Sequence, residues 1–168
     1  MAEKFIRDQE AQIKLKSIVD QIDIGTICTF TPLSPYPHGV PMSRQEVDEA
    51  GNIWYICSSE SETHKNLEID DKISIFYADP KNYRFLSING TAILSRDQVR
   101  IDRYWNKMME SWFEKGKDDP NIKLIKVTPS EAHYWESGSN KIVNLFAMLK
   151  NALTGSNEDI GEEGELKI

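Results

Sequence analysis

The stretch best suited to bind a charged ligand begins where an apolar run gives way to polar side chains. Residues 53–57 are apolar and partly β-branched or aromatic, which is typical of a strand, and Ser59 with Glu62 forms a helix-start pattern. The first turn of this helix then carries Thr63, His64 and Lys65. Helix amides with a hydroxyl and an ammonium group suit a phosphate dianion. A capped surface helix with a solvated lysine explains the same stretch, and from these residues alone we favour that simpler interpretation.

The strand before this stretch supplies a second set of candidates. Residues 39–47 and 53–57 flank a glycine-containing loop, the pattern of a β-hairpin. Val40, Met42 and Arg44 would share one face of the first strand, because side chains alternate along a strand. Two apolar residues followed by an arginine are compatible with a groove that ends at an anion. They are equally compatible with an arginine at the rim of a barrel.

Motifs of several common enzyme classes are absent from the sequence. It contains neither GxGxxG after a strand nor GxxxxGK[ST], so a Rossmann fold or an NTPase is disfavoured. It lacks GxSxG, and neither cysteine has an evident His/Asn partner set, so a hydrolase triad is weakly supported. The three histidines lack zinc-site spacing, and we expect no metal. The pair Asp118 and Asp119 is explained by a turn that stops a helix before Pro120.

Charge and composition limit the classes of ligand and partner that this protein can bind. The 168 residues include 20 basic and 27 acidic side chains, a net charge of −7, which argues against sequence-independent nucleic-acid binding but not against one small phosphorylated ligand. The N-terminal residues lack the apolar core of a signal peptide, and no apolar run approaches the length of a membrane span. Cys28 and Cys57 lie in strand-like runs and are expected to be buried, reduced thiols. We therefore expect a cytoplasmic protein with no nucleic-acid or membrane partner.

Periodicity predicts the elements that must position these residues. A helical stripe runs from Ala11 to Ile22, a second helix follows Ser95 with an apolar stripe that ends at Trp112, and a third covers residues 142–153. Strand patterns cover residues 24–30, 39–47, 53–57, 72–78, 83–94, 122–127 and 132–135. Gly90 is expected to mark a bulge or bend, and residues from about 156 to 168 form an acidic tail expected to be mobile.

These elements predict an α+β fold. Short strands joined by hairpins favour an antiparallel barrel or sheet with flanking helices. The sequence has no internal repeat and no interior linker, so residues 1–168 are expected to form a single domain.

Several short motifs, taken together in their order, resemble those of a known family. Met42 and Ser43 follow a proline, and further motifs lie at residues 53–57, 63–65, 77–80, 88–92, 112–120 and 132–135. The set resembles the general stress protein branch of the pyridoxamine 5'-phosphate oxidase-like family. That resemblance implies an antiparallel split β-barrel, the FMN-binding split barrel, which forms a homodimer with two FMN sites at the subunit interface.

The resemblance also implies roles for individual residues. The flavin would be lined by the strand from Val40 to Gln45, with Met42, Ser43 and Arg44, and by the strand end at Ile56 and Cys57. Its phosphate would lie at Thr63, His64 and Lys65, and Trp135 would reach the flavin from the second subunit.

Two departures from the family pattern stand out. Val40 occupies a position where the family usually has an arginine, so that either Arg44 or His64 supplies the missing charge or flavin binding is weaker. No arginine follows Arg103, so the Arg-x-His pair that holds substrate phosphate in true vitamin B6 oxidases is missing. Oxidation of pyridoxamine 5'-phosphate is therefore not expected.

The leading hypothesis is a stress-related, FMN-dependent oxidoreductase that acts on an unknown small molecule with a nicotinamide or another reductant. FAD or another flavin stays open as the cofactor, and no catalytic acid or base is assigned. The alternative is a flavin-binding stress protein without turnover, acting as a carrier, sensor or interaction module. A third interpretation is a barrel that binds heme, a deazaflavin or nothing.

Overall fold

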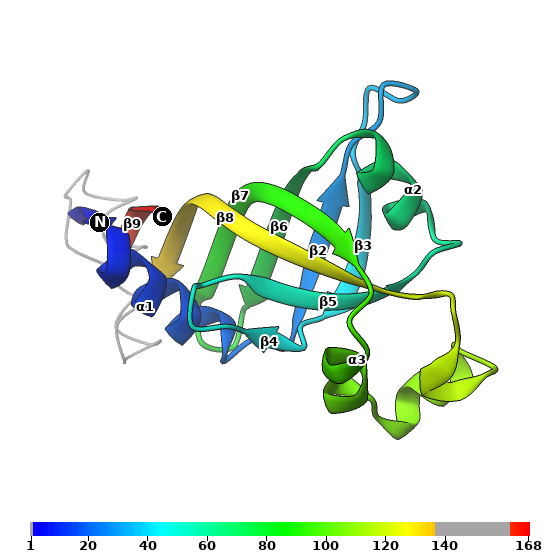
Figure 1. Cartoon of the computed structure of the whole chain (residues 1–168). Coiled ribbons are helices and arrows are strands. Elements are labelled where there is room, and N and C mark those ends of the chain that lie inside the picture. Colours follow the sequence, from blue (N-terminus) through cyan, green and yellow to red (C-terminus); the bar gives the residue numbers. More distant parts are fainter. Residues whose placement is uncertain (1, 137–161) are drawn as a thin grey trace.

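The computed structural model describes residues 2–136 and 162–168 (Figure 1). The strands are β1 (Ala2–Arg7), β2 (Ile24–Thr29), β3 (His38–Ser43), β4 (Glu46–Val47), β5 (Ile53–Ser58), β6 (Lys72–Asp79), β7 (Arg84–Ser95), β8 (Ile122–Glu136) and β9 (Glu162–Lys167). The helices are α1 (Asp8–Val19), α2 (Glu62–Ile69) and α3 (Gln98–Tyr104), with 3-10 turns η1 (Lys107–Ser111) and η2 (Gly116–Asp118).

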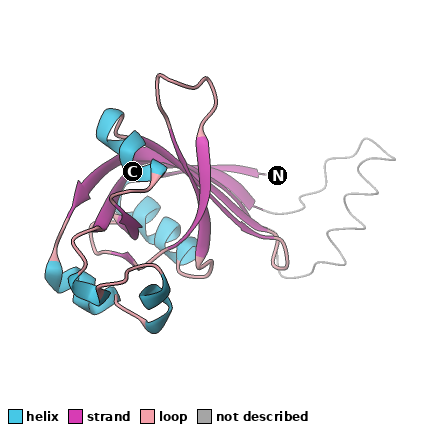
Figure 2. Ribbon diagram, turned by 90° about the vertical axis from the view of Figure 1, so that its right-hand side faces the viewer, coloured by secondary structure: helices cyan, strands magenta, loops and turns pink. Residues whose placement is uncertain are grey.

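The nine described strands form one curled sheet. Its order is β1-β9-β8-β7-β6-β2-β3, and β5 pairs with both β4 and β8. All of these pairs are antiparallel except β1 with β9. The long strand β8 pairs with β7, β9 and β5, so the sheet bends into a half-barrel, seen from the side in Figure 2. The predicted α+β class with an antiparallel split barrel is confirmed.

The described residues form two apolar core clusters. The larger one fills the barrel between the sheet and α1, where Ala11, Leu15, Ile18 and Val19 are fully buried, as their helical spacing predicts. The smaller one packs α3 and η1 against the ends of β5 and β8 and contains Trp54, Ile101, Tyr104, Met109, Phe113, Ile122 and Leu124. None of the described helices is long and apolar enough to cross a membrane.

The predicted single helix after Ser95 is wrong in two respects. Asp97, not Ser95, caps α3, because its carboxylate accepts the amides of Val99 and Arg100. The helix ends at Tyr104, and a separate 3-10 turn begins after Asn106, whose side chain caps it. The break turns the end of the predicted apolar stripe outward, so that the helical period does not describe residues 105–112.

Sequence periodicity also misses the two strands at the edge of the sheet. The tail that was expected to be mobile contains β9, which lies between β1 and β8, and β1 itself was not predicted. Residues 122–127 and 132–135 belong to the single strand β8, and the register shift between Asn89 and Gly90 confirms the predicted bulge. The predicted helix over residues 142–153 lies outside the described residues.

A pair of buried tyrosine hydroxyls links two strands inside the barrel. The Tyr55 and Tyr77 hydroxyls hydrogen-bond to each other, and burial raises the pKa of Tyr55 and raises that of Tyr77 to about 12. Both phenols are therefore neutral, and one hydroxyl donates to the other, so that each of them has a hydrogen-bond partner.

Replacing Tyr55 with phenylalanine is expected to lower the free energy of unfolding by about 1–3 kcal/mol, because the Tyr77 hydroxyl loses its partner in an apolar site. The double variant with Tyr77→Phe should lose much less than the sum of the two single changes, since no buried hydroxyl then lacks a partner. Urea unfolding of the four proteins measures this coupling. Additive losses would show that the two hydroxyls do not depend on each other.

Candidate functional site

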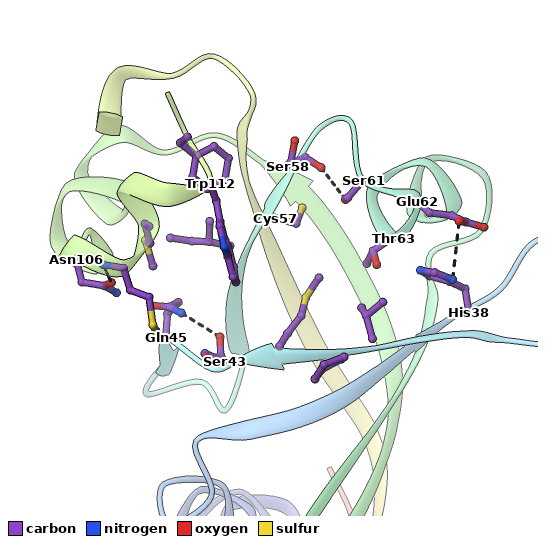
Figure 3. A pocket seen from close by; sticks show the side chains of 17 residues that line it. His38, Ser43, Gln45, Cys57, Ser58, Ser61, Glu62, Thr63, Asn106 and Trp112 are labelled. Carbon is purple, nitrogen blue, oxygen red and sulfur yellow. Dashed lines mark hydrogen bonds and ion pairs between the residues drawn. The ribbon is translucent and has the colours of Figure 1, made fainter. Parts of the chain in front are cut away.

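A cavity of about 440 Å³ lies between β3, the end of β5, the start of α2 and the η1 segment (Figure 3). Its volume is within the usual range of small-molecule sites. One wall consists of apolar strand residues, among them Val40, Met42 and Ile56. The opposite wall comes from η1 and the residues beside it (residues 106–113, called the η1 segment below), with Met108, Met109, Trp112 and Phe113.

The end of the cavity at α2 is polar. Ser61 caps this helix: its side chain accepts the amide of His64 at 3.2 Å and donates to the carbonyl of Ser58 at 2.7 Å. The first amides of a helix have no acceptor within the helix, so those that follow Ser61 can face a ligand. Ser58, Ser61 and the buried Thr63 add hydroxyl groups to this end. Helix amides and hydroxyls together suit an anion.

Few charged groups line the cavity. Among the described residues, its lining contains no lysine and no arginine. His38 and Glu62 face each other at the α2 end, with 3.9 Å between the imidazole Nδ1 and a carboxylate oxygen (Figure 3). Any positive charge in this wall would therefore have to come from His38.

Five of the nine predicted site residues line this cavity: Met42, Ser43, Ile56, Cys57 and Thr63. The hairpin and the strand–helix junction thus meet at one site, as their positions in the sequence suggested. The other four predicted residues do not line it.

Arg44 lies beyond the end of β3, and its side chain is directed elsewhere. Its guanidinium is 3.6 Å from a carboxylate oxygen of Asp20 and 3.5 Å from one of Asp23, and its Nε is buried without a hydrogen-bond acceptor in the described structure. The alternation of partly buried and exposed residues continues from Val40 through Met42 to Arg44, which agrees with a shared face. Arg44 does not line the cavity, however, so the groove does not end at this arginine.

The remaining three predicted residues do not belong to the wall of the site: His64 and Lys65 follow Thr63 on α2, whereas Trp135 lies at the far end of β8 from Ile122, which pairs with Ser58. His64 is buried, with Nδ1 3.6 Å from the carboxylate of Glu68, and Lys65 is exposed on α2. Trp135 lies on β8, opposite Phe85 of β7, and its ring contacts that of His133 with 4.5 Å between ring centroids.

Sequence reasoning predicted the helix amides and Thr63 at the polar end, but it did not assign His38, Ser58 or Ser61 to that end and it missed the η1 wall. His38 could have been found, because it precedes Val40 by two residues and so shares its strand face. The hydroxyls of Ser58 and Ser61 became visible only when the helix start was fixed at Ser61. Trp112 was assigned to a buried helical stripe, which hid its position at the cavity.

Cys57 lines the cavity as a protonated thiol. Burial raises its pKa from an ordinary 9.0 to about 12, despite a hydrogen bond with Ser61 and the nearby Lys123, which both lower it. Both cysteines are free, and Cys28 is only partly buried, so the expectation of two buried thiols is confirmed for Cys57 alone. At neutral pH the Cys57 thiol is not a nucleophile.

The stability of the fold is expected to fall above pH 9. The pKa of the Cys57 thiol is near 9 in the unfolded chain but about 12 in the folded chain. Between these pH values the thiol is ionised in the unfolded chain and protonated in the folded chain, so a rise in pH favours unfolding. The free energy of unfolding should drop by up to about 1.4 kcal/mol per pH unit for this group, with Tyr77 adding a similar slope from pH 10 to 12. Urea unfolding from pH 8 to 10.5 measures the slope. Cys57→Ala should flatten it between pH 9 and 10, and an unchanged slope would contradict this assignment.

Comparison with known proteins places this architecture in a family. A family model described as "Pyridoxamine 5'-phosphate oxidase like" matches residues 10–159. General stress protein 26 from Bacillus subtilis is 22% identical over 145 residues, which cover 83% of this chain and 99% of that protein.

Solved structures share the fold. A structure described as a general stress protein 26 from Jannaschia sp. CCS1 has a TM-score of 0.72 at 21% identity and covers 93% of this chain and 97% of that chain. The general stress FMN/FAD binding protein from Xanthomonas citri has a TM-score of 0.65 at 25% identity, with 79% and 93% covered. The family match over most of the chain, the relationship to a general stress protein and the shared half-barrel agree: the chain belongs to the pyridoxamine 5'-phosphate oxidase-like family, in its general stress protein branch.

Proposed function

We propose that this protein binds a flavin, most simply FMN, in the cavity between β3, β5, α2 and η1. The proposal rests on one observation: the cavity is polar at its α2 end and apolar along its strand and η1 walls. Helix amides and hydroxyls at Ser58, Ser61 and Thr63 suit the phosphate, and the apolar strand and η1 walls suit the isoalloxazine ring. The related Xanthomonas citri protein described as FMN/FAD binding supports the same ligand class.

The test of flavin binding is direct. Purified protein is unfolded, and the absorption spectrum and mass of the released small molecule are measured. We expect a flavin in the released fraction, or, for protein purified empty, saturable uptake of FMN with one flavin per chain. Colourless protein that takes up neither FMN nor FAD would overturn the proposal, and a released heme would replace it.

We propose further that two chains form a homodimer that completes each flavin site. On the outer face of the sheet, the register places Phe85 beside Trp135 and Ala78, and exposed Phe76 and Ile24 lie on neighbouring strands. An apolar sheet face of this kind is suited to bury against a second copy. Trp135 would then reach the flavin of the partner. Sedimentation equilibrium should give twice the chain mass, and Trp135→Ala should weaken FMN binding without unfolding the protein.

When bound, the flavin would supply redox chemistry, and we propose that the protein is an oxidoreductase in the cytoplasm acting on a small molecule. Its own residues bind and orient the cofactor. Anaerobic addition of reduced nicotinamide should bleach the flavin, and a defined acceptor should restore its colour. Flavin that binds tightly but is not reduced by any nicotinamide or dithiol donor would favour the carrier or sensor alternative.

A further inference from the structure

Two large apolar side chains of the η1 wall are left exposed at the cavity. Met108 is 70% exposed and Trp112 75% exposed, and both line the cavity. Figure 3 shows Trp112 directed into the cavity from the side opposite His38 and Thr63. Exposed apolar surface at the mouth of a cavity is typical of a binding site.

The backbone that carries Met108 and Trp112 is held in place by buried neighbours and hydrogen bonds. Met109 and Phe113, which alternate with the exposed residues, are buried in the smaller core cluster. The Asn106 side chain accepts the amide of Met108 at 3.0 Å, and the carbonyl of Met109 accepts the amides of Trp112 at 3.0 Å and Phe113 at 3.2 Å. The backbone that carries Trp112 is thus held by protein contacts, so little ordering is required when a ligand binds.

The η1 wall offers an anion no cationic partner among the described lining residues. The residues that the η1 segment contributes to the lining, in the described part of the chain, carry no charged side chain: Asn106, Met108, Met109, Trp112 and Phe113. The whole chain carries a net charge of −7. A carboxylate or phosphate placed beside Trp112 would lose hydration without gaining a cationic partner there.

We propose that Trp112 and Met108 form the binding site for the small-molecule substrate of this protein, as distinct from a nicotinamide reductant, and that this substrate is a flat aromatic compound that carries no negative charge. Its ring would lie against the indole of Trp112 in an offset stack, with the Met108 thioether at its edge. The inference rests on the proposed function, because it takes the strand wall and the α2 end of the cavity to be occupied by the flavin.

The experiment uses the full chain loaded with FMN and two probes that share one ring system. 2-Naphthalenemethanol is uncharged and 2-naphthoate is anionic, and equilibrium dialysis gives the affinity of each. We expect the alcohol to bind saturably, with a perturbed flavin absorption band, and the naphthoate to bind about tenfold more weakly or worse. Trp112→Ala should weaken binding of the alcohol roughly tenfold, because the stacking surface is lost.

Tyr36→Ala is the matched control. Tyr36 is 77% exposed and does not line the cavity, so its removal deletes an equally exposed ring elsewhere and should leave the affinity for the alcohol unchanged. Equal affinity for the two probes, or an unaffected Trp112→Ala variant, would overturn the inference. Conversion of that variant to a monomer would assign Trp112 to the subunit contact instead. Flavin content is measured before any probe is added, so a protein that takes up no flavin identifies failure of the proposed function itself.

Discussion

Replacing Gly90 with alanine is expected to lower the free energy of unfolding by about 3 kcal/mol. Gly90 lies at the register shift between β7 and β8, where the two backbones approach each other closely. A Cβ atom at this position would lie 2.3 Å from the carbonyl oxygen of Thr128 and 3.0 Å from the Cα of Pro129. Both neighbours are backbone atoms paired within the sheet, so neither can rotate away, and the strands must separate locally.

Gly39→Ala is the matched control for this prediction. Gly39 is also a strand glycine, but its added Cβ would meet only side-chain atoms, the Cys28 Sγ at 3.5 Å and the Thr26 Cγ2 at 3.6 Å, which are ordinary contacts. Its free energy of unfolding should change by less than about 1 kcal/mol. Urea unfolding of both variants, with flavin absent, gives the comparison. If Gly90→Ala lowers the free energy of unfolding as little as Gly39→Ala, the strands at the bulge accommodate a methyl group without strain, and the prediction is wrong.

The elements that sequence periodicity predicted correctly depend on local signals. The α1 stripe faces the core because residues separated by three or four positions share a helix face. The bulge at Gly90 was predicted because glycine weakens the interior of a strand and is therefore typical of a bulge or bend. The strand–turn–helix at residues 53–65 was predicted from the change of period and the capping residues, although the cap itself is Ser61.

What the sequence did not reveal depends on contacts between distant segments. β9 is a strand because it pairs with β1 and β8, and the acidic residues of the tail do not indicate those pairing partners. Arg44 pairs with Asp20 and Asp23 instead of lining the cavity, and the positions of these carboxylates are set by tertiary packing. The η1 wall was misjudged because the Asn106 side chain ends a pattern that otherwise continues with helical spacing.

His38 and Glu62 provide the sharpest test of where the flavin phosphate lies. They face each other at the α2 end of the cavity, and the imidazole can donate a hydrogen bond to a phosphate whereas the carboxylate repels it. His38→Ala should weaken FMN binding roughly 10- to 100-fold, the scale of a hydrogen bond to a charged group. Glu62→Gln should strengthen it only about threefold, because this side chain is mostly exposed and its field is screened by solvent.

Comparing FMN with riboflavin distinguishes effects on binding of the phosphate from effects on binding of the ring. It has the same ring and lacks the phosphate, so neither variant should change its affinity by more than about twofold if both side chains act on that group. Lys65→Ala is measured in the same titration, because this exposed lysine on α2 is the other cation that the sequence offers for the phosphate. A large FMN-specific loss in Lys65→Ala, with none in His38→Ala, would show that the ammonium group folds over the helix start to reach the ligand. Equal losses for FMN and riboflavin in His38→Ala would place His38 at the ring or in the fold, and the phosphate elsewhere.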